Sequence, residues 1–310
     1  MKKVLVTANS FGKFSDAPTK LLQENGFEVT FNPYGRKMEE DEFIGAIADA
    51  DAVILSTEQV SKRVIDSAKK LRIISRYGVG LDNIDLDYCK AKGLPVTITG
   101  SGNSNAVAEY AVTSMLAALK GLFYSANRAA SGTWAKTTGL DLDGRCVGVI
   151  GLGSIGRRVV QKLSGFDVKI LGYDIFYDDA FCSRYKVEKA SLEEVFRQAD
   201  VITFHIPSIS DKPLLDAQAF RTLKDDVVIV NTARASLIDY EALYENLKSK
   251  KVFAAALDVH ECEPRFNEKL MGLDNVILTP HNAALSKEAI DKTSMLAVEN
   301  ILKEFGLLQR

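Results

Sequence analysis

Residues 147–156 read Val147-Gly148-Val149-Ile150-Gly151-Leu152-Gly153-Ser154-Ile155-Gly156. The run begins with apolar residues, at the length of a buried parallel strand, and ends in glycines with the spacing G-x-G-x-x-G. Apolar residues then recur at helical spacing over 155–164. A second apolar run, 168–173, ends in Asp174. The stretch therefore predicts a strand, a glycine turn and a helix, followed by a second strand with an acidic residue at its end.

This arrangement is typical of a dinucleotide-binding unit. Gly151 would allow the tight turn, Gly153 the close approach of a pyrophosphate, and Gly156 the packing of helix on strand. The helix N-terminus would present free N–H groups to the phosphates. Asp174 would accept hydrogen bonds from the ribose hydroxyls and repel a 2′-phosphate, and no arginine directly follows it. The sequence therefore favours NAD over NADP. The alternative to a dinucleotide site is a glycine turn in an ordinary strand–helix unit.

The composition is that of a globular protein long enough for two domains, with 310 residues, 46% of them hydrophobic and 26% charged. A net charge of −2 gives no electrostatic reason to expect a nucleic acid or an anionic membrane as a partner. No apolar run has the length of a membrane span. The four cysteines lack metal or redox spacing. We expect a cytoplasmic protein with reduced thiols and no metal site.

Strand and helix patterns alternate along most of the chain. Strands are predicted at 3–7, 28–31, 52–56, 71–75, 95–98, 146–150, 168–173, 201–205, 227–231, 252–257 and 276–278. Helices are predicted between them, including a long one from about 106 to 124 and a final one over about 286–305. Alternation at this spacing predicts an α/β protein with two doubly wound parallel-sheet domains.

The domain boundaries follow from the glycine turn and the final helix. Six strands, with the glycine turn after the first, make a complete Rossmann domain. The final helix has no accompanying strand, so we expect it to return to the first domain. This assigns 103–284 to an NAD-binding Rossmann domain, inserted into a flavodoxin-like substrate domain of residues 1–102 and 285–310. A ligand would bind in a cleft between them.

The chain has three histidines as candidate acid–base residues. His281 follows a Thr-Pro pair at a strand end, and Glu263 is a candidate partner because a nearby carboxylate raises the pKa of an imidazole. His205 lies at another strand end, on the cofactor side. His260 is interpreted as a partly exposed surface residue. Arg234, after the strand 227–231, completes the set of candidate site residues at strand ends. The alternative interpretation of Arg234 is an ordinary surface cation.

A second glycine pair, Gly78 and Gly80, follows the strand 71–75. At the carboxyl end of a parallel strand it would place the backbone N–H groups of Val79 and Gly80 where such sheets bind ligands. The local sequence is equally compatible with a glycine-rich connecting loop that binds nothing.

Several motifs follow one another in a recognisable order. They are Tyr77-Gly78-Val79-Gly80-Leu81-Asp82-Asn83-Ile84-Asp85, Asn103-Ser104-Asn105-Ala106-Val107-Ala108-Glu109, the glycine turn with Asp174, Asn231-Thr232-Ala233-Arg234, Ala256-Leu257-Asp258-Val259, Glu263-Pro264 and Thr279-Pro280-His281. In this order, over nearly the whole chain, they resemble the D-isomer-specific 2-hydroxyacid dehydrogenases, especially the phosphoglycerate dehydrogenase-like branch.

The resemblance implies an NAD-dependent oxidoreductase that interconverts a D-2-hydroxy acid and its 2-keto acid, with 3-phosphoglycerate or a hydroxypyruvate-type compound as candidates. Arg234, Glu263 and His281 would be catalytic, with His281 as the acid–base residue. Val79, Gly80 and Arg234 would bind the substrate. It also implies a homodimer built through the NAD domain. Trp134 would lie in the segment, or arm, through which one subunit of the family contacts the other. The NAD-binding residues would be Gly151, Gly153, Ser154, Ile155, Gly156, Asp174, His205, Thr232 and Asp258.

The chain departs from the family pattern in places. Ala235 stands where Gly is usual, Gly100 where Pro is common, and His260 where an aromatic residue is usual. Phosphoglycerate-specific relatives carry arginines in the loop after the third strand, where this chain has Leu55-Ser56-Thr57-Glu58. Glu58 would repel a substrate phosphate unless Lys62 or Arg63 compensates. Specificity is expected to lie in the loops 9–16 and 55–60.

Two other functions stay open at this point. The family includes NAD-sensing transcriptional corepressors, although no peptide-binding extension or basic tail is apparent in this chain. It also includes formate and phosphite dehydrogenases. Formate dehydrogenases have Gln beside the histidine, so Glu263 argues against that branch. The motifs do not distinguish a phosphite dehydrogenase from a 2-hydroxyacid dehydrogenase.

Overall fold

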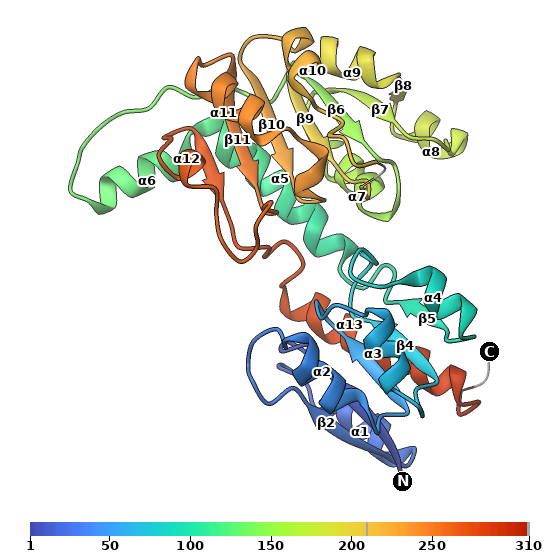
Figure 1. Ribbon diagram of the computed structural model, residues 1–310. Coiled ribbons are helices and arrows are strands. Elements are labelled where there is room, and N and C mark those ends of the chain that lie inside the picture. The colour runs from blue at the N-terminus through green and yellow to red at the C-terminus, as the bar shows by residue number, and fades with distance from the viewer. Residues whose placement is uncertain (209, 309–310) are drawn as a thin grey trace. The chain divides into compact units, whose positions relative to one another are not determined.

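The computed structural model of this protein describes residues 1–208 and 210–308. The chain divides into two compact units (Figure 1). The first unit comprises Met1–Asn103 and Ala284–Arg310, and the second is the continuous segment Ser104–Ala283. Each unit has its own sheet and its own hydrophobic core.

The first unit is built on a five-stranded parallel sheet in the order β2-β1-β3-β4-β5. Its strands are β1 (Lys2–Val6), β2 (Phe27–Phe31), β3 (Ala52–Leu55), β4 (Ile73–Arg76) and β5 (Val96–Ile98). Its helices are α1 (Ala17–Glu24), α2 (Glu40–Ile47), α3 (Lys62–Ser67), α4 (Leu86–Ala91) and α13 (Lys287–Glu304). This strand order is that of flavodoxin-like proteins, so the fold predicted from the alternating pattern is confirmed.

Helices cover both faces of this sheet. Helices α2 and α3 bury Phe43, Ile47 and Val64 against one face. Helix α13 buries Val298 and Ile301 against the other face, together with residues of β1 and β3. The last helix of the chain thus completes a sheet whose strands all lie within the first 98 residues.

The second unit is built on a seven-stranded parallel sheet in the order β12-β11-β10-β9-β6-β7-β8. Its strands are β6 (Cys146–Ile150), β7 (Lys169–Tyr173), β8 (Val187–Lys189), β9 (Val201–Phe204), β10 (Val227–Asn231), β11 (Val252–Leu257) and β12 (Val276–Leu278). Its helices are α5 (Ser104–Lys120), α6 (Leu122–Ala130), α7 (Ser154–Leu163), α8 (Asp179–Arg184), α9 (Leu192–Gln198), α10 (Ala217–Thr222), η1 (Ala235–Leu237), α11 (Tyr240–Lys248) and α12 (Glu268–Met271). The predicted Rossmann arrangement is confirmed, with β6 and β9 at the point where the strand order reverses.

The sequence predicts six strands in this sheet, and the structure has a seventh, β8. This strand has only three residues and pairs with β7 at the edge of the sheet. Val187 is buried, whereas Glu188 and Lys189 are exposed. A strand this short and this polar carries no apolar run, so the pattern could not reveal it.

The predicted helix 106–124 is two helices, α5 and α6. The helix is interrupted at Gly121, whose φ of +58° is in the left-handed region that favours glycine. Within the described ranges no single helix is long and apolar enough to cross a membrane; α5 and α6 satisfy that test only as a pair bent by 70°.

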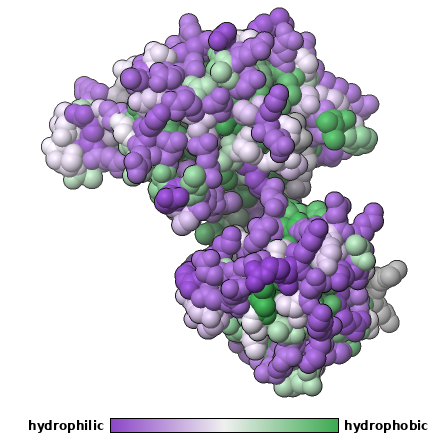
Figure 2. All heavy atoms as spheres, in the orientation of Figure 1, coloured by the Kyte–Doolittle hydropathy of each residue, from purple (hydrophilic) through white to green (hydrophobic). Residues whose placement is uncertain are grey.

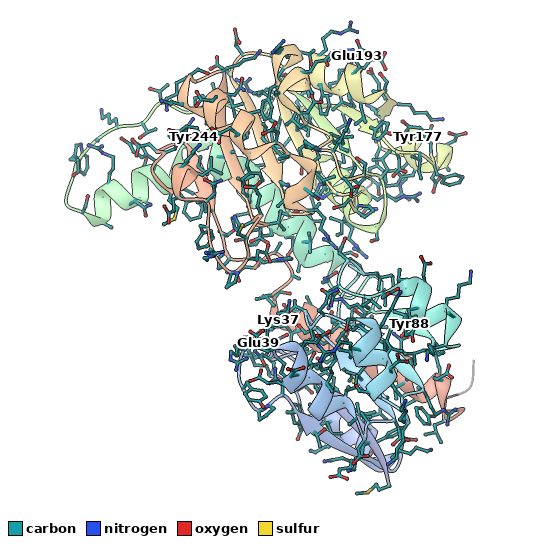
Figure 3. The ribbon with its side chains drawn as sticks, in the orientation of Figure 1. Lys37, Glu39, Tyr88, Tyr177, Glu193 and Tyr244 are labelled. Carbon is teal, nitrogen blue, oxygen red and sulfur yellow. The ribbon has the colours of Figure 1, made fainter. Side chains whose placement is uncertain are left out.

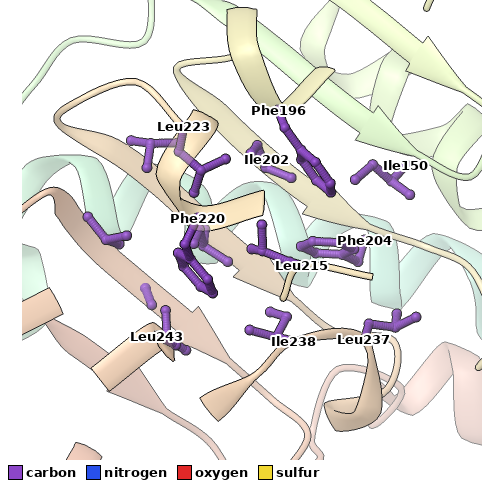
Figure 4. Packing of buried hydrophobic residues seen from close by; sticks show 14 of the residues in the cluster. Ile150, Phe196, Ile202, Phe204, Leu215, Phe220, Leu223, Leu237, Ile238 and Leu243 are labelled. Atoms are coloured by element: carbon purple, nitrogen blue, oxygen red, sulfur yellow. The ribbon is translucent and has the colours of Figure 1, made fainter. Parts of the chain in front are cut away.

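The core of the second unit lies on both faces of its sheet. Figure 4 shows the face covered by α9, α10 and α11, where Phe196, Phe204 and Phe220 interlock with aliphatic side chains. Helices α5 and α7 cover the opposite face. In Figure 2 the visible surface of each unit is mainly hydrophilic, with hydrophobic residues in small separate patches. Packing on both faces of the sheet holds the strands in place, and the loops described below start at the ends of these strands.

Candidate active site

The glycine turn between β6 and α7 has the geometry of a phosphate-binding loop. Gly151 has a φ of +101°, and a Cβ on Gly156 would lie 1.8 Å from the Gly151 carbonyl oxygen. No side chain could be accommodated at Gly156 without moving the backbone. Gly153 precedes α7 without capping the helix through a side chain, and no atom lies within 4 Å of where its Cβ would be. The first N–H groups of α7, including those of Ser154 and Ile155, have no partner within the helix itself and are available to a ligand at this end.

Asp174 lies at the end of β7 and is tied to the same turn. Its Oδ2 accepts a hydrogen bond from the Leu152 N–H at 2.6 Å, and its Oδ1 accepts one from the Phe176 N–H at 3.1 Å. The Asp174 N–H donates to the hydroxyl of Tyr177 (Figure 3), which in turn donates to the Gly172 carbonyl. The carboxylate is therefore held beside the glycine turn, where the sequence predicts a ribose.

Arg157 is the cation nearest in sequence to this turn, and its side chain is already engaged. Its Nε donates to the Leu152 carbonyl at 2.8 Å, and its Nη1 pairs with Asp178 at 2.7 Å. The arginine braces the turn rather than offering a free guanidinium. The arrangement agrees with the preference for NAD inferred from Asp174.

His281 and Glu263 form a hydrogen-bonded ion pair. His281 Nδ1 lies 3.0 Å from Oε2 and 3.1 Å from Oε1 of Glu263. The hydrogen bond with Glu263 raises the pKa of His281, and the positive charge of Arg234 opposes this rise. Burial raises the pKa of Glu263, but the hydrogen bond and charge of His281 outweigh it and the net pKa is below its ordinary value. Within the described residues His281 Nε2 has no hydrogen-bond partner.

The turn that carries His281 is fastened by Asp258, at the end of β11. This carboxylate is only 2% exposed. It accepts hydrogen bonds from the hydroxyl of Thr279 at 2.7 Å and from the N–H groups of Asn282 and Ala283, both at 2.8 Å. Hydrogen bonds to charged groups contribute about 1.5–3 kcal/mol each. Asp258, predicted as an NAD ligand, therefore also fixes the position of the acid–base candidate.

Of the other two histidines, His260 is buried and His205 is partly buried. Burial lowers the pKa of His205 to about 3, and its Nε2 is hydrogen-bonded to the Thr203 hydroxyl at 2.9 Å. A Cβ on Gly151 would lie 2.6 Å from the His205 carbonyl oxygen, so this residue supports the glycine turn. The prediction that His260 is partly exposed on the surface is wrong. It is 8% exposed, and its ring packs edge to face against Phe266 and reaches the Thr279 carbonyl.

Arg234 is positioned by a residue that sequence reasoning did not single out. Asn231, at the end of β10, is fully buried, and its amide donates to the Arg234 carbonyl at 2.8 Å while its oxygen accepts from the Ala233 N–H. The Arg234 side chain donates to the Ala233 carbonyl at 2.7 Å. Ala235 begins η1 without a positive φ, so alanine fits where the family usually has glycine.

The loop after β4, in the first unit, is braced from within by Arg76. The arginine donates to the carbonyl oxygens of Gly80 at 2.7 Å, Tyr77 at 2.9 Å and Leu55 at 3.1 Å. In the part of the chain that the structure describes, the N–H groups of Val79 and Gly80 have no acceptor. The loop therefore presents two backbone donors on a fixed support, as an anion-binding loop would.

The expectation that Glu58 would face a substrate phosphate is wrong. Its side chain is 1% exposed and accepts a hydrogen bond from the buried hydroxyl of Thr7. Arg63, named as a possible counter-charge, pairs instead with Glu40 and Asp41. The charge of Glu58 is turned into the first unit and gives no argument against a phosphorylated substrate.

The second unit has the features that NAD needs. Open space lies over Gly153, the Asp174 carboxylate stands beside the turn, and the buried hydroxyl oxygen of Thr232 has no hydrogen-bond partner within the described residues. An unpaired buried polar atom at the end of β10 is suited to an amide group such as that of nicotinamide.

Comparison with known proteins agrees with the fold and the site. Residues 112–283 match the family model of the D-isomer specific 2-hydroxyacid dehydrogenase, NAD binding domain. A hydroxypyruvate reductase of Thermotoga maritima is 37% identical, covering 94% of this chain and 95% of its own length. A D-3-phosphoglycerate dehydrogenase of Archaeoglobus fulgidus is 35% identical over 93% of this chain, which spans only 55% of that protein. The solved apo-structure of D-lactate dehydrogenase from Escherichia coli superposes with a TM-score of 0.85 at 29% identity, covering 99% of this chain and 98% of that chain.

The fold and the site define an NAD-dependent oxidoreductase with two α/β units. The chain belongs to the D-isomer-specific 2-hydroxyacid dehydrogenase family, as the order of its motifs predicts. Its cofactor is NAD, and its reaction interconverts a 2-hydroxy acid and the corresponding 2-keto acid.

Proposed function

We propose that His281 is the acid–base residue of this reaction and that Glu263 is its partner. The observation that supports this most directly is the pair itself: Glu263 occupies Nδ1 of the imidazole, while Nε2 is left without a partner among the described residues. In keto-acid reduction Nε2–H donates its proton to the C2 oxygen, and in the reverse direction neutral Nε2 accepts the hydroxyl proton. Hydride transfer to or from C2 is the chemistry that bound NAD would supply.

We propose that Arg234, Val79 and Gly80 bind the substrate. A guanidinium is suited to a planar carboxylate, which it can hold through two parallel hydrogen bonds. The two backbone N–H groups of the loop after β4 are donors suited to an anionic group of the substrate. Arg234 also polarises the carbonyl, since a fixed positive charge favours the negative charge that develops on oxygen during reduction.

The assignment of roles to the two units is also our proposal. The second unit holds NAD through Gly151, Gly153, Ser154, Ile155 and Gly156, with the remaining ligands from the strand ends: Asp174, His205, Thr232 and Asp258. The first unit, with its braced loop after β4, is the substrate domain.

We propose that the chain forms a homodimer through its second unit. Helix α6 has no buried residue, and it exposes Leu122 and Phe123. Trp134, in the segment that follows α6, is 95% exposed. Exposed apolar side chains in succession mark an interaction surface, and light scattering would measure the mass of the assembly.

We also propose that the protein is located in the cytoplasm, which its free thiols and its need for NAD support.

The proposed function is tested by NADH oxidation with a panel of 2-keto acids. The panel contains hydroxypyruvate, its 3-phosphate, glyoxylate and pyruvate, each assayed with NADH and with NADPH. Hydroxypyruvate comes first because the Thermotoga relative that carries that name matches over nearly its whole length. We expect NADH-dependent turnover of at least one compound, and weaker activity with NADPH because of Asp174. NADH binding with no turnover of any keto acid would contradict the proposal and favour a sensor.

Replacing Glu263 by glutamine is expected to move the alkaline limb of keto-acid reduction to lower pH. Glu263 raises the pKa of His281, so the protonated acid persists to higher pH when the carboxylate is present. Reduction is lost as pH rises through that pKa, and removing the cause of the rise brings the loss to lower pH. The measurement is kcat against pH for the best keto acid.

Glu261→Gln is the matched control, because it removes the same charge two positions away on an exposed part of the loop. The limb should stay in place in this variant. An unchanged limb in Glu263→Gln would mean that Glu263 does not set the proton affinity of His281.

A further inference from the structure

His260 connects the two loops that carry the proposed acid–base pair. Its backbone N–H donates to Glu263 Oε1 at 3.1 Å, and its ring Nε2 lies 2.8 Å from the carbonyl oxygen of Thr279. A carbonyl oxygen only accepts hydrogen bonds, so Nε2 must carry the hydrogen. One residue thus holds the carboxylate on one side and the turn before His281 on the other.

The carbonyl of Thr279 is shared by two histidines. It also accepts a hydrogen bond from the backbone N–H of His281 at 3.0 Å, across Pro280. His281 has a φ of +55°, in the left-handed region that is uncommon for residues other than glycine. Such a backbone persists only where surrounding contacts hold it. Asp258 fastens the turn from one end, and the ring of His260 fastens the carbonyl at its start.

The surroundings of His260 keep its ring in one orientation. Phe266 packs against it edge to face, with ring centroids 4.7 Å apart. The buried hydroxyl of Tyr240 donates to the Val259 carbonyl at 2.6 Å, directly before His260 in the chain. Nδ1 of the ring is buried and has no partner within the described residues. A phenyl ring would fill the same space, but it would leave the Thr279 carbonyl without this second donor.

We infer that His260 is a positioning residue for the acid–base pair, and that its ring hydrogen bond to Thr279 sets the distance between His281 and Glu263. The inference rests on the proposed function, since it presumes that this pair transfers the proton. It requires no change in the charge of His260, because the ring acts as a donor through Nε2–H.

Other ionisable groups also face this part of the molecule. Glu263 and Glu261 belong to the same loop, Asp258 ends β11, Tyr240 begins α11, and His281 follows β12. Arg234, after β10, also acts on His281. All of these groups are retained in His260→Phe and His260→Gln, so a change in the pH profile of those two variants can be assigned to the position of the pair.

The test compares His260→Phe with His260→Gln in keto-acid reduction. The phenyl side chain keeps the aromatic volume and the backbone bond to Glu263 but removes the donor to Thr279. The glutamine amide can restore a donor near the position of Nε2. We expect kcat to fall about ten- to a hundredfold in His260→Phe, with KM little changed and the alkaline limb at lower pH, because the proton donor is misplaced. Substantial recovery of both is expected in His260→Gln.

Cys262→Ser is the matched control, since it alters an exposed side chain on the same loop. It should behave as the unaltered protein does. Wild-type kcat and an unmoved limb in His260→Phe would overturn the inference even if the melting temperature fell, because a merely structural residue would give that result. Equal losses in His260→Phe and His260→Gln would also overturn it. Activity surviving in His281→Asn would instead refute the proposed function.

The tautomer of His260 can be measured without any substitution at that position. Nitrogen-15 NMR of the unaltered protein should show a hydrogen on Nε2 and an unprotonated Nδ1. The resonances can be assigned with variants of the other histidines. A hydrogen on Nδ1 alone would exclude the bond to Thr279 and overturn the inference, even if the substituted proteins failed to fold.

Discussion

Replacing His281 by asparagine is expected to lower kcat for keto-acid reduction by about 10²–10⁴-fold, the usual contribution of a general acid. Asparagine is chosen because it tolerates the left-handed backbone of this position better than most residues do. Its amide cannot supply a proton to the C2 oxygen near neutral pH. The measurement is single-turnover reduction with saturating NADH.

NADH affinity, followed by the fluorescence of the cofactor, should be nearly unchanged in this variant. Asn282→Ala is the matched control, because the neighbouring N–H bond to Asp258 involves only the backbone. A loss of activity that is equal in both variants would point to collapse of the turn. Retention of activity in His281→Asn would remove His281 from the mechanism.

Replacing Arg234 by alanine is expected to lower kcat/KM for the keto acid by about a hundredfold or more. The loss of charge-assisted hydrogen bonds to a carboxylate costs about 3 kcal/mol, and each 1.4 kcal/mol is a factor of ten. The same variant should move the alkaline limb to higher pH, because the charge of Arg234 lowers the pKa of His281. This shift is opposite in sign to that expected for Glu263→Gln, so the two variants distinguish the two charges.

Arg234→Lys should recover only part of the loss, since an ammonium group cannot hold a carboxylate with a planar fork. Arg221→Ala, which removes an exposed guanidinium of α10, is the control for net charge. Full activity in Arg234→Ala would show that the substrate carboxylate is bound elsewhere.

The sheets and the glycine turn could be predicted because their signals are local. Buried parallel strands are continuous apolar runs, and the tight packing of Gly156 on Gly151 admits no side chain. The proximity of His281 and Glu263 is likewise predictable, since both follow parallel strands and such strand ends share one edge of the sheet.

What could not be predicted depends on which way a side chain points. His260 and Glu58 are polar residues in loops, where no periodicity indicates a direction, and both turn inward to partners distant in the sequence. The positioning role of Asn231 likewise depends on the conformation of the turn after β10. The break at Gly121 required a left-handed residue inside an otherwise uninterrupted helical pattern.

The second unit is one uninterrupted stretch of chain. The glycine turn, Asp174, Arg234, Glu263 and His281 all lie on it, and the hydrogen bonds that fasten the His281 turn begin and end within it. We therefore expect the residues proposed for proton transfer and NAD binding to be inherited together. If the first unit is the substrate domain, as we propose, relatives would differ in the keto acids they accept through exchanges in that unit.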